Sequence, residues 1–396
     1  MSDATSTRTR RIETALVAIF AVLLIVVLPL LDATGIISHF TLNLWGKYLC
    51  YALLAISVDL LWGYTGLLSL GQALFFALGG YMHGMYLMRM IGDLGQHKKP
   101  IPDFLVFLGW TELPSFWVPF ANFPFALTMA FLVPGLIAYL FGHLAFRSRI
   151  KGVYFSILTQ AALLVFFNFF NGQQKLINGT NGLKTDTAMI FGQMVGSDGI
   201  QRLLFWLTVL LAIGAFLLCR WLTSGRFGDA LVAIRDDEPR LRFTGYNPTA
   251  YKTVVFAVAG ALAGISGALY TVQSGIVSPQ YMAVPFSIEM VIWVAVGGRG
   301  TLIGAVLGAV LINYAKSLVS EALPETWLFI QGGLFLLVVT ALPDGLVGWW
   351  RSGGPARLIA LVAPPPKLST YPGLDLNPEV QAEQDQLSRN PGQEPS

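Results

Sequence analysis

The sequence is poor in charge and in the side chains that bind metals or form disulfides. Only 12% of its 396 residues are Asp, Glu, Lys or Arg, about half the share found in a soluble domain. It has two cysteines and four histidines. Cys50 and Cys219 both lie in apolar runs, so we expect neither a disulfide framework nor a metal site. The basic residues are scattered and form no single stripe, which argues against a nucleic-acid partner.

Motifs of nucleotide and ester chemistry are also missing. The glycine-rich "GGRGTLIG" at Gly297–Gly304 has no lysine followed by Ser or Thr, so it is no phosphate-binding loop. No serine lies in a G-x-S-x-G turn. His83 and His143 are lone histidines in apolar runs, where an interhelical hydrogen bond is the commoner role. The sequence therefore predicts no enzyme, no catalytic residue and no cofactor.

What the chain has instead is apolar length. Apolar residues make up 55% of the sequence, and the mean hydropathy is +0.63. Many runs reach the ~20 residues that a bilayer core requires of a helix. We expect an all-α polytopic integral membrane protein with about ten spans, or eight if the two runs on either side of "GGRG" are partial or re-entrant. The runs are Ile12–Leu31, Trp45–Trp62, Gly71–Met88, Phe120–Phe146, Gly152–Phe170, Leu203–Leu222, Val254–Val272, Val284–Val296, Leu302–Leu318 and Trp327–Leu342.

Basic residues predict the orientation, because Lys and Arg favour cytoplasmic loops. With the N-terminus inside, the basic residues of 8–11, 147–151, 226–242 and 351–367 are all cytoplasmic. An even number of crossings then places both termini in the cytoplasm. We expect a cytoplasmic segment at 1–11, a transmembrane domain at 12–345 and a cytoplasmic, largely disordered tail at 346–396, which is rich in Pro, Gln and Asn.

Charge gathers in one place, Arg226–Arg242, where eight of seventeen residues are charged. Apolar residues recur there at helical offsets, and Pro239 excludes one continuous helix. The pattern predicts a short helix from about Asp229, a break, and a second turn that Asp237 or Glu238 caps. A mixed-charge amphipathic helix on the cytoplasmic face suits docking to a soluble partner. A solvated loop with local ion pairs is an equal alternative.

Three further stretches combine glycine with polar residues. In "GYTGLLSLGQALFFALGGY", Gly63–Tyr81, freed backbone groups would suit a solute path, although close helix packing is the commoner account. The same packing account is favoured for the glycines four apart in Gly260–Tyr270 and Gly300–Asn313. "NGTNGL", Asn178–Leu183, reads as a turn more than as a glycosylation acceptor.

Together these stretches resemble one family from about Trp45 to Leu342. "GLLSLGQALFFALGGY" resembles the signature of the larger, LivM-type permeases of branched-chain amino-acid ABC importers. Ser224–Lys252 resembles their cytoplasmic loop that docks on the ATPase, and "GTNGL" resembles a motif of their outside loop. The sequence departs from the pattern at Gln72, where His is commoner, and before Thr180, where a second glycine is usual. The insert Met88–Trp117 resembles the UrtC-type permeases of the urea-importer branch.

The resemblance implies a permease in the bacterial inner membrane that works with a sister permease, two ATP-binding subunits and a periplasmic solute-binding protein. The departures and the insert favour urea as its solute, with a branched-chain amino acid or a short amide as the alternative. A stand-alone channel or secondary transporter is a further alternative, with Asp59, Glu289 and Lys316 as candidate coupling or gating residues. A membrane scaffold without transport is the last.

The resemblance also places the functional residues. Gly228 would let the chain turn sharply into the helix, and Leu231 and Ile234 would fill an apolar groove of the ATPase. The expected ATPase contacts are Gly228, Ala233, Ile234, Arg235, Asp236 and Glu238. Urea calls for uncharged hydrogen-bonding partners, so we expect its path near Ser69, Gln72 and Gln160, with Thr180 and Asn181 at the outer mouth.

Overall fold

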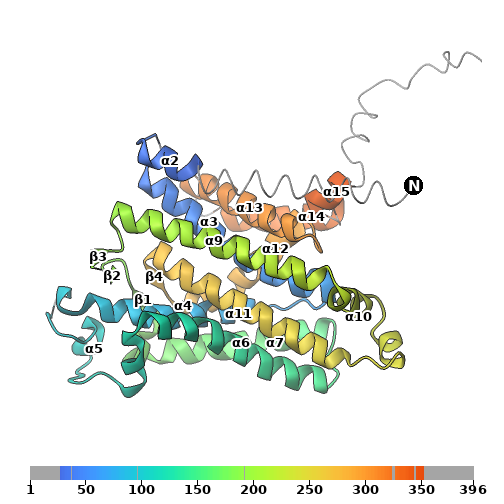
Figure 1. Cartoon of the computed structure of the whole chain (residues 1–396), viewed down its shortest axis with the longest axis horizontal. Helices are drawn as coiled ribbons and strands as arrows, with labels where there is room; N and C mark the ends of the chain where they lie inside the picture. The colour runs from blue at the N-terminus through green and yellow to red at the C-terminus, as the bar shows by residue number, and fades with distance from the viewer. Residues whose placement is uncertain are drawn as a thin grey trace, which may run out of the picture. The chain divides into compact units, whose positions relative to one another are not determined.

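The long apolar runs form helices that lie side by side (Figure 1). The computed structural model describes residues 27–36, 38–95, 97–190, 192–322, 326–342 and 345–351. The expected N-terminal segment, most of the first apolar run and the tail beyond residue 351 lie outside these residues. The described residues up to Trp349 belong to one compact unit.

Each expected run after the first coincides with a helix. The α-helices are α2 (Leu28–Ala33), α3 (His39–Thr65), α4 (Gln72–Ile91), α5 (Asp103–Phe107), α6 (Phe123–Arg147), α7 (Val153–Gly172), α8 (Gln174–Ile177), α9 (Asp198–Thr223), α10 (Arg226–Phe243), α11 (Pro248–Ser274), α12 (Val284–Gly297), α13 (Leu302–Ala322), α14 (Trp327–Ala341) and α15 (Gly345–Arg351). Within the described residues, six of them are long and apolar enough to cross a membrane, namely α3, α6, α7, α9, α11 and α13. α12 and part of α14 are shorter apolar helices. The prediction of an all-α, multi-pass membrane protein is confirmed.

Helix α11 is the centre of the packing and lies against α3, α4 and α6. Its glycines allow the backbones to approach closely. A Cβ atom at Gly264 would collide with the carbonyl of Ala130 in α6, and one at Gly267 would collide with the carbonyl of Phe76 in α4. The glycines predicted to pack helices therefore lie at helix crossings, as small residues do in membrane bundles.

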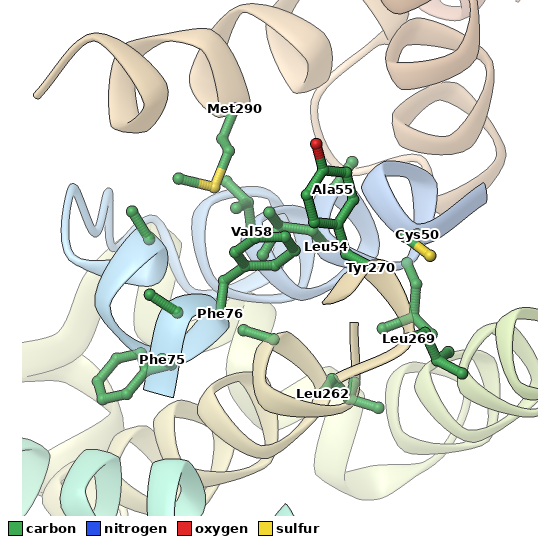
Figure 2. Packing of buried hydrophobic residues seen from close by; sticks show 14 of the residues in the cluster. Cys50, Leu54, Ala55, Val58, Phe75, Phe76, Leu262, Leu269, Tyr270 and Met290 are labelled. Atoms are coloured by element: carbon green, nitrogen blue, oxygen red, sulfur yellow. The ribbon is translucent and has the colours of Figure 1, made fainter. Parts of the chain in front are cut away.

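Large side chains fill the space that the glycine crossings leave. Figure 2 shows Phe76 of α4, Tyr270 of α11 and Met290 of α12 gathered around Leu54 and Val58 of α3. All five side chains are buried. Helix α3 thus packs against the other three helices through the middle of its length.

The two ends of the unit differ. Helix α10 lies at one end, and the short elements lie at the other (Figure 1). Those short elements are the 3-10 helices η2 (Gly92–Leu94), η3 (Ser115–Ala121), η4 (Gly179–Asn181) and η5 (Pro279–Met282) and the two-residue strands β1 (Leu183–Lys184), β2 (Met189–Ile190), β3 (Gln193–Met194) and β4 (Ile276–Val277). β1 pairs antiparallel with β4, and β2 with β3.

The insert Met88–Trp117 is folded and not an open loop. Leu105 and Trp117 are fully buried. The Trp117 indole N–H donates to the carbonyl of Leu176, at 3.1 Å, and Arg89 donates to the carbonyls of Trp117 and Val118. The insert is therefore bonded to the segment between α7 and α9. We refer to these two segments together as one layer.

The predicted turn at Asn178–Leu183 is confirmed. Asn178 and Gly182 have φ angles of 59° and 70°, which Asn and Gly adopt most readily. The Asn178 amide donates to the Gly182 carbonyl at 2.7 Å. Leu183 then pairs with Val277 of β4, so the turn ties the end of α7 to the end of α11.

Replacing Gly267 by Val should destabilise the bundle by about 1–3 kcal/mol, the usual cost of overpacking, because the new side chain would collide with the backbone of α4. The check is thermal unfolding of the detergent-solubilised protein. Gly214→Val in α9 is the matched control, since no atom lies within 4 Å of its Cβ position. Equal melting temperatures for the two variants would contradict the proposed crossing.

Candidate functional site

The charged cluster forms helix α10, which has the predicted break. It begins at Arg226, three residues earlier than expected, and departs from helical geometry at Asp237 (φ −155°, ψ 86°). The Asp237 carboxylate accepts a hydrogen bond from the Arg240 backbone N–H at 3.1 Å. Asp237 is therefore the cap of the second turn, whereas Glu238 has a different role.

One face of α10 is buried against its own chain. Leu231 is fully buried, Ile234 is 5% exposed, and Gly228 is buried as well. A Cβ atom at Gly228 would collide with the carbonyl of Thr223. Leu231 and Ile234 therefore pack within this chain, which corrects the expectation that they fill an apolar groove of a partner. Thr223 is the last residue of α9, so Gly228 allows the chain to turn closely from α9 into α10.

Arg235 is exposed, but its guanidinium group reaches back to α3. Its Nη1 donates to the carbonyl of Gly63 near the end of α3 at 2.9 Å, and its Nε donates to Asp236 at 3.0 Å. Gly66, in the left-handed conformation at φ 72°, lies against the Arg235 side chain. Arg235 therefore attaches the first half of α10 to α3, while the Asp236 side chain remains 63% exposed.

Glu238 attaches the second half of α10 to α11. Its carboxylate accepts from Arg242 at 2.7 Å and from Lys252 at 3.1 Å. The Lys252 side chain is 1% exposed, and its Nζ lies 4.9 Å from the ring centroid of Phe146 in α6. Burial raises the pKa of Glu238, but the hydrogen bonds and the two cations outweigh it, so the pKa is lowered overall.

The outward side of α10 carries the residues that remain accessible. Ala233 is partly exposed, and Asp236, Arg240 and Phe243 are exposed, Phe243 to 91%. Sequence reasoning missed Phe243. The available signal was a large aromatic residue at the end of the most charged stretch of the chain.

The segment between α3 and α4 is held by helix α7. Ser156 donates to the carbonyl of Leu68 at 2.7 Å, and the backbone N–H of Leu70 donates to Thr159 at 3.1 Å. A Cβ atom at Gly71 would lie 3.0 Å from the Thr159 carbonyl oxygen. The chain between the two helices therefore runs in direct contact with the first turns of α7.

This contact brings three of the expected path residues together. Gln72 and Gln160 directly follow Gly71 and Thr159, which touch each other, and Ser69 accepts from the Gly71 backbone N–H at 3.3 Å. Ser69 and Gln72 are 3% and 1% exposed. Both amide atoms of Gln72 and of Gln160 lack a hydrogen-bond partner among the described residues. Unpaired amides at this depth are costly, and a passing polar solute would satisfy them.

Thr180 and Asn181 lie elsewhere. Both are exposed and belong to η4, beyond the opposite end of α7 from Gln160. The turn that holds them contacts β4 and η5. The two groups of expected path residues are thus separated by most of the length of α7.

Sequence reasoning missed an aromatic cluster beside Gln72. Its rings come from five elements, and the ring centroids of its contacting pairs are 5.0–6.4 Å apart. Phe76 lies one helical turn beyond Gln72. The members are Tyr51, Phe76, Tyr270, Tyr281, Phe286 and Trp293, and we refer to them as the aromatic cluster.

The three ionisable residues considered for gating are all engaged. Lys316 of α13 binds Glu289 of α12, with Nζ 2.7 and 3.0 Å from the two carboxylate oxygens. Asp59 is fully buried and accepts from the Gly300 backbone N–H at 2.7 Å. No group of three or more metal-binding side chains occurs in the described part of the chain.

The apolar bundle with a charged, kinked helix at one end is that of a multi-pass membrane protein, and comparison with known families gives its function class. Residues 40–339 match the family described as the permease component of branched-chain amino acid transport systems. The chain belongs to this family, and it is therefore a transport component and not an enzyme.

The relatives agree with this assignment. The chain is 24% identical to the high-affinity branched-chain amino acid permease protein LivM of Salmonella typhimurium, over 80% of this chain and 72% of LivM. It is 24% identical to a probable LivM of Methanocaldococcus jannaschii, over 75% and 90% of the two chains. It is 20% identical to the permease protein BraD of Pseudomonas aeruginosa, over 75% and 91%. No solved structure matches the chain.

Glu238→Gln should destabilise the protein at neutral pH by about 2 kcal/mol, less than the ~3–5 kcal/mol of a fully buried pair, because the Glu238 side chain is 14% exposed. The lowered pKa of Glu238 means that its contribution is present above pH 4.5 and is lost as the pH falls through the depressed folded-state value. Melting temperatures of wild type and variant should therefore converge in acid. Asp236→Asn is the control, because its exposed pair contributes at most about 1 kcal/mol. A difference that stays constant with pH would contradict this role for Glu238.

Proposed function

We propose that this chain is the permease subunit of an ATP-driven importer and that α10 transmits the work of a separate ATPase. The observation that carries the proposal is the way α10 is held. It presents exposed Asp236, Arg240 and Phe243 on one side, while Arg235 and Glu238 bind α3 and α11 on the other. A helix that is both exposed to a soluble partner and fastened to two spans is suited to pass on a displacement.

The proposed assembly contains a sister permease, two ATP-binding subunits and a periplasmic binding protein. The absence of a phosphate-binding loop from the sequence supports the need for a separate ATPase. The end with α10 would face the cytoplasm, since Arg147, Arg149 and Lys151 lie in the chain there and favour that side. The opposite layer, formed by the insert and the segment after α7, would then receive the binding protein.

The proposed ATPase surface consists of Ala233, Asp236, Arg240 and Phe243. Of the residues first expected as contacts, Ala233 and Asp236 remain in this surface. Arg235 and Glu238 act behind it as anchors, and Gly228 and Ile234 support the helix from below.

Exchanging the two outward charges, with Asp236→Arg and Arg240→Glu in one protein, should reduce the ATPase that co-purifies with the permease by about tenfold. A lost interfacial charge pair typically costs enough for that change. The experiment is affinity purification of the tagged permease from membranes, with the ATPase quantified in the eluate. Asp186→Arg, an exposed carboxylate in the layer at the other end, is the matched control. Undiminished ATPase in the exchanged variant would remove α10 as the docking site.

We propose urea as the solute. Two observations support it: the resemblance of the insert to the urea-importer branch, and the unpaired, uncharged amides of Gln72 and Gln160. Urea donates and accepts hydrogen bonds without carrying charge, so such amides can replace the hydrogen bonds that it makes to water in solution. Ser69 lies in the same contact, and Thr180 and Asn181 would meet the solute at the outer mouth.

A branched-chain amino acid is the second candidate. The named relatives are branched-chain amino acid permeases. The Glu289–Lys316 ion pair joins α13 to α12, the helix that carries Phe286 and Trp293 of the aromatic cluster. Opposite charges next to apolar rings would suit a zwitterion with an apolar side chain.

Uptake of labelled urea and labelled leucine should separate the two candidates in cells that lack this gene and in cells to which it is restored. We expect restoration to recover urea uptake, and Gln72→Leu with Gln160→Leu to lower it by about tenfold, the scale of a lost polar contact to a substrate. Gln193→Leu, in the exposed strand β3, serves as the control. Recovery of leucine uptake with urea uptake unchanged would reject urea and leave the permease assignment in place.

A further inference from the structure

The loop between α12 and α13 is bound to the end of α3 beside the attachment point of α10. Asp59 accepts from the Gly300 backbone N–H at 2.7 Å. The Arg299 guanidinium lies 5.2 Å from the ring centroid of Trp62. One helical turn beyond Asp59, the Gly63 carbonyl receives Arg235 of α10. Two elements far apart in the sequence therefore bind adjacent turns of the same helix.

We propose that Asp59 is a positioning residue that couples the α12–α13 hairpin (Val284–Ala322) to α10. Together, the bonds Asp59–Gly300 and Arg235–Gly63 form a latch at the end of α3. A displacement of α10 would pass through this latch to the hairpin. The inference rests on the proposed role of α10 and adds the route by which its motion enters the membrane.

The hairpin is built to move as one body. A Cβ atom at Gly297 would collide with the carbonyl of Gly304, and one at Gly308 would collide with the carbonyl of Trp293. The two helices therefore touch backbone to backbone, and such contacts resist sliding. A pull at Gly300 would be carried along both helices.

The far parts of the hairpin lie where the solute is proposed to pass. Phe286 and Trp293 belong to the aromatic cluster, and both pack on Tyr51 of α3, with ring centroids 5.8 and 5.0 Å apart. Helix α12 also contacts α4 and α7, the helices that carry Gln72 and Gln160. Movement of the hairpin against α3 would open or close these contacts.

The chemistry of Asp59 favours a specific task over simple packing. A carboxyl group with no solvent exposure is costly to bury, and an apolar residue of similar size would fill the same space more cheaply. Its Oδ1 is used for the Gly300 bond, and Oδ2 has no hydrogen-bond partner within the described structure. Asp59 therefore provides a buried hydrogen-bond acceptor for the loop of the hairpin, and the bond to Gly300 is the one that the described residues show.

Gly63 provides an independent way to disturb the same latch. A Cβ atom there would collide with Oδ1 of Asp59 and would lie 2.5 Å from the Gly300 nitrogen and 2.6 Å from its Cα. Gly63→Ala would therefore push the Asp59 carboxylate and the loop away from this end of α3 without removing any polar group. Gly214→Ala in α9, where the Cβ position is open, is the matched control.

The test is a reconstituted complex of permease and ATPase in proteoliposomes, with solute uptake and ATP hydrolysis measured together. Asp59→Leu and Gly63→Ala should keep the ATPase bound and hydrolysing but lower the uptake per ATP by about tenfold, as for the loss of a charge-assisted hydrogen bond. Asp59→Asn keeps an acceptor oxygen and should stay within about threefold of wild type. A residue that only stabilises the fold would instead lower the amount and the melting temperature of the complex and leave uptake per ATP unchanged.

The outcomes distinguish a failure of the latch from a failure of the proposed transport function. Wild-type uptake per ATP in both Asp59→Leu and Gly63→Ala would overturn the latch. An Asp59→Asn variant as defective as Asp59→Leu would also overturn it, because the acceptor would not be the feature that matters. If Asp59→Leu fails to assemble, Gly63→Ala decides the question. Failure of the proposed function would appear earlier, as a wild-type complex without ATP-dependent uptake.

Discussion

The close contact of α11 with its neighbours is the constraint on which the rest of the structure depends. Within a bilayer there is little hydrophobic driving force between helices, so association relies on close packing. Gly264 and Gly267, one helical turn apart on α11, allow backbone contacts with α6 and α4. The segment that precedes α4 is in turn hydrogen-bonded to α7. The glycines of α11 therefore help to place the helix that carries Gln72, at the start of the proposed solute path.

Several charged side chains in this protein bind an opposite charge or a backbone carbonyl on a second helix. Glu238 and Lys252 join α10 to α11, Glu289 and Lys316 join α12 to α13, and Arg235 reaches the backbone of α3. Ionisable groups are expensive near a bilayer, so each of these pairs fixes a geometry that an apolar contact would leave freer. The scarcity of charge in the sequence makes its few clusters informative about function.

Local patterns in the sequence were sufficient for the elements but not for the contacts between them. Apolar length predicted the spans, and Pro239 with Asp237 predicted the break in α10, because these are properties of neighbouring residues. The burial of Ile234 was not predictable, since it depends on where the helices around α10 lie. The Asp59–Gly300 bond joins residues 241 positions apart, and the aromatic cluster draws on five elements. No spacing rule in a single sequence relates such residues.

The break in α10 explains why the helix has two anchors. At Asp237 the backbone leaves helical geometry, so the two halves can follow different directions. Arg235 lies before the break and binds α3, while Glu238 lies after it and binds α11. A straight helix held at one point would rotate about that point when pushed from outside. With a support on each side of the break, a force on the exposed surface is divided between α3, which the α12–α13 hairpin also grips, and α11, on which the bundle is packed. Helix α3 is thus connected to the hairpin that we propose to move, and α11 to the centre of the bundle. Such an arrangement would convert a push on α10 into relative motion of the two.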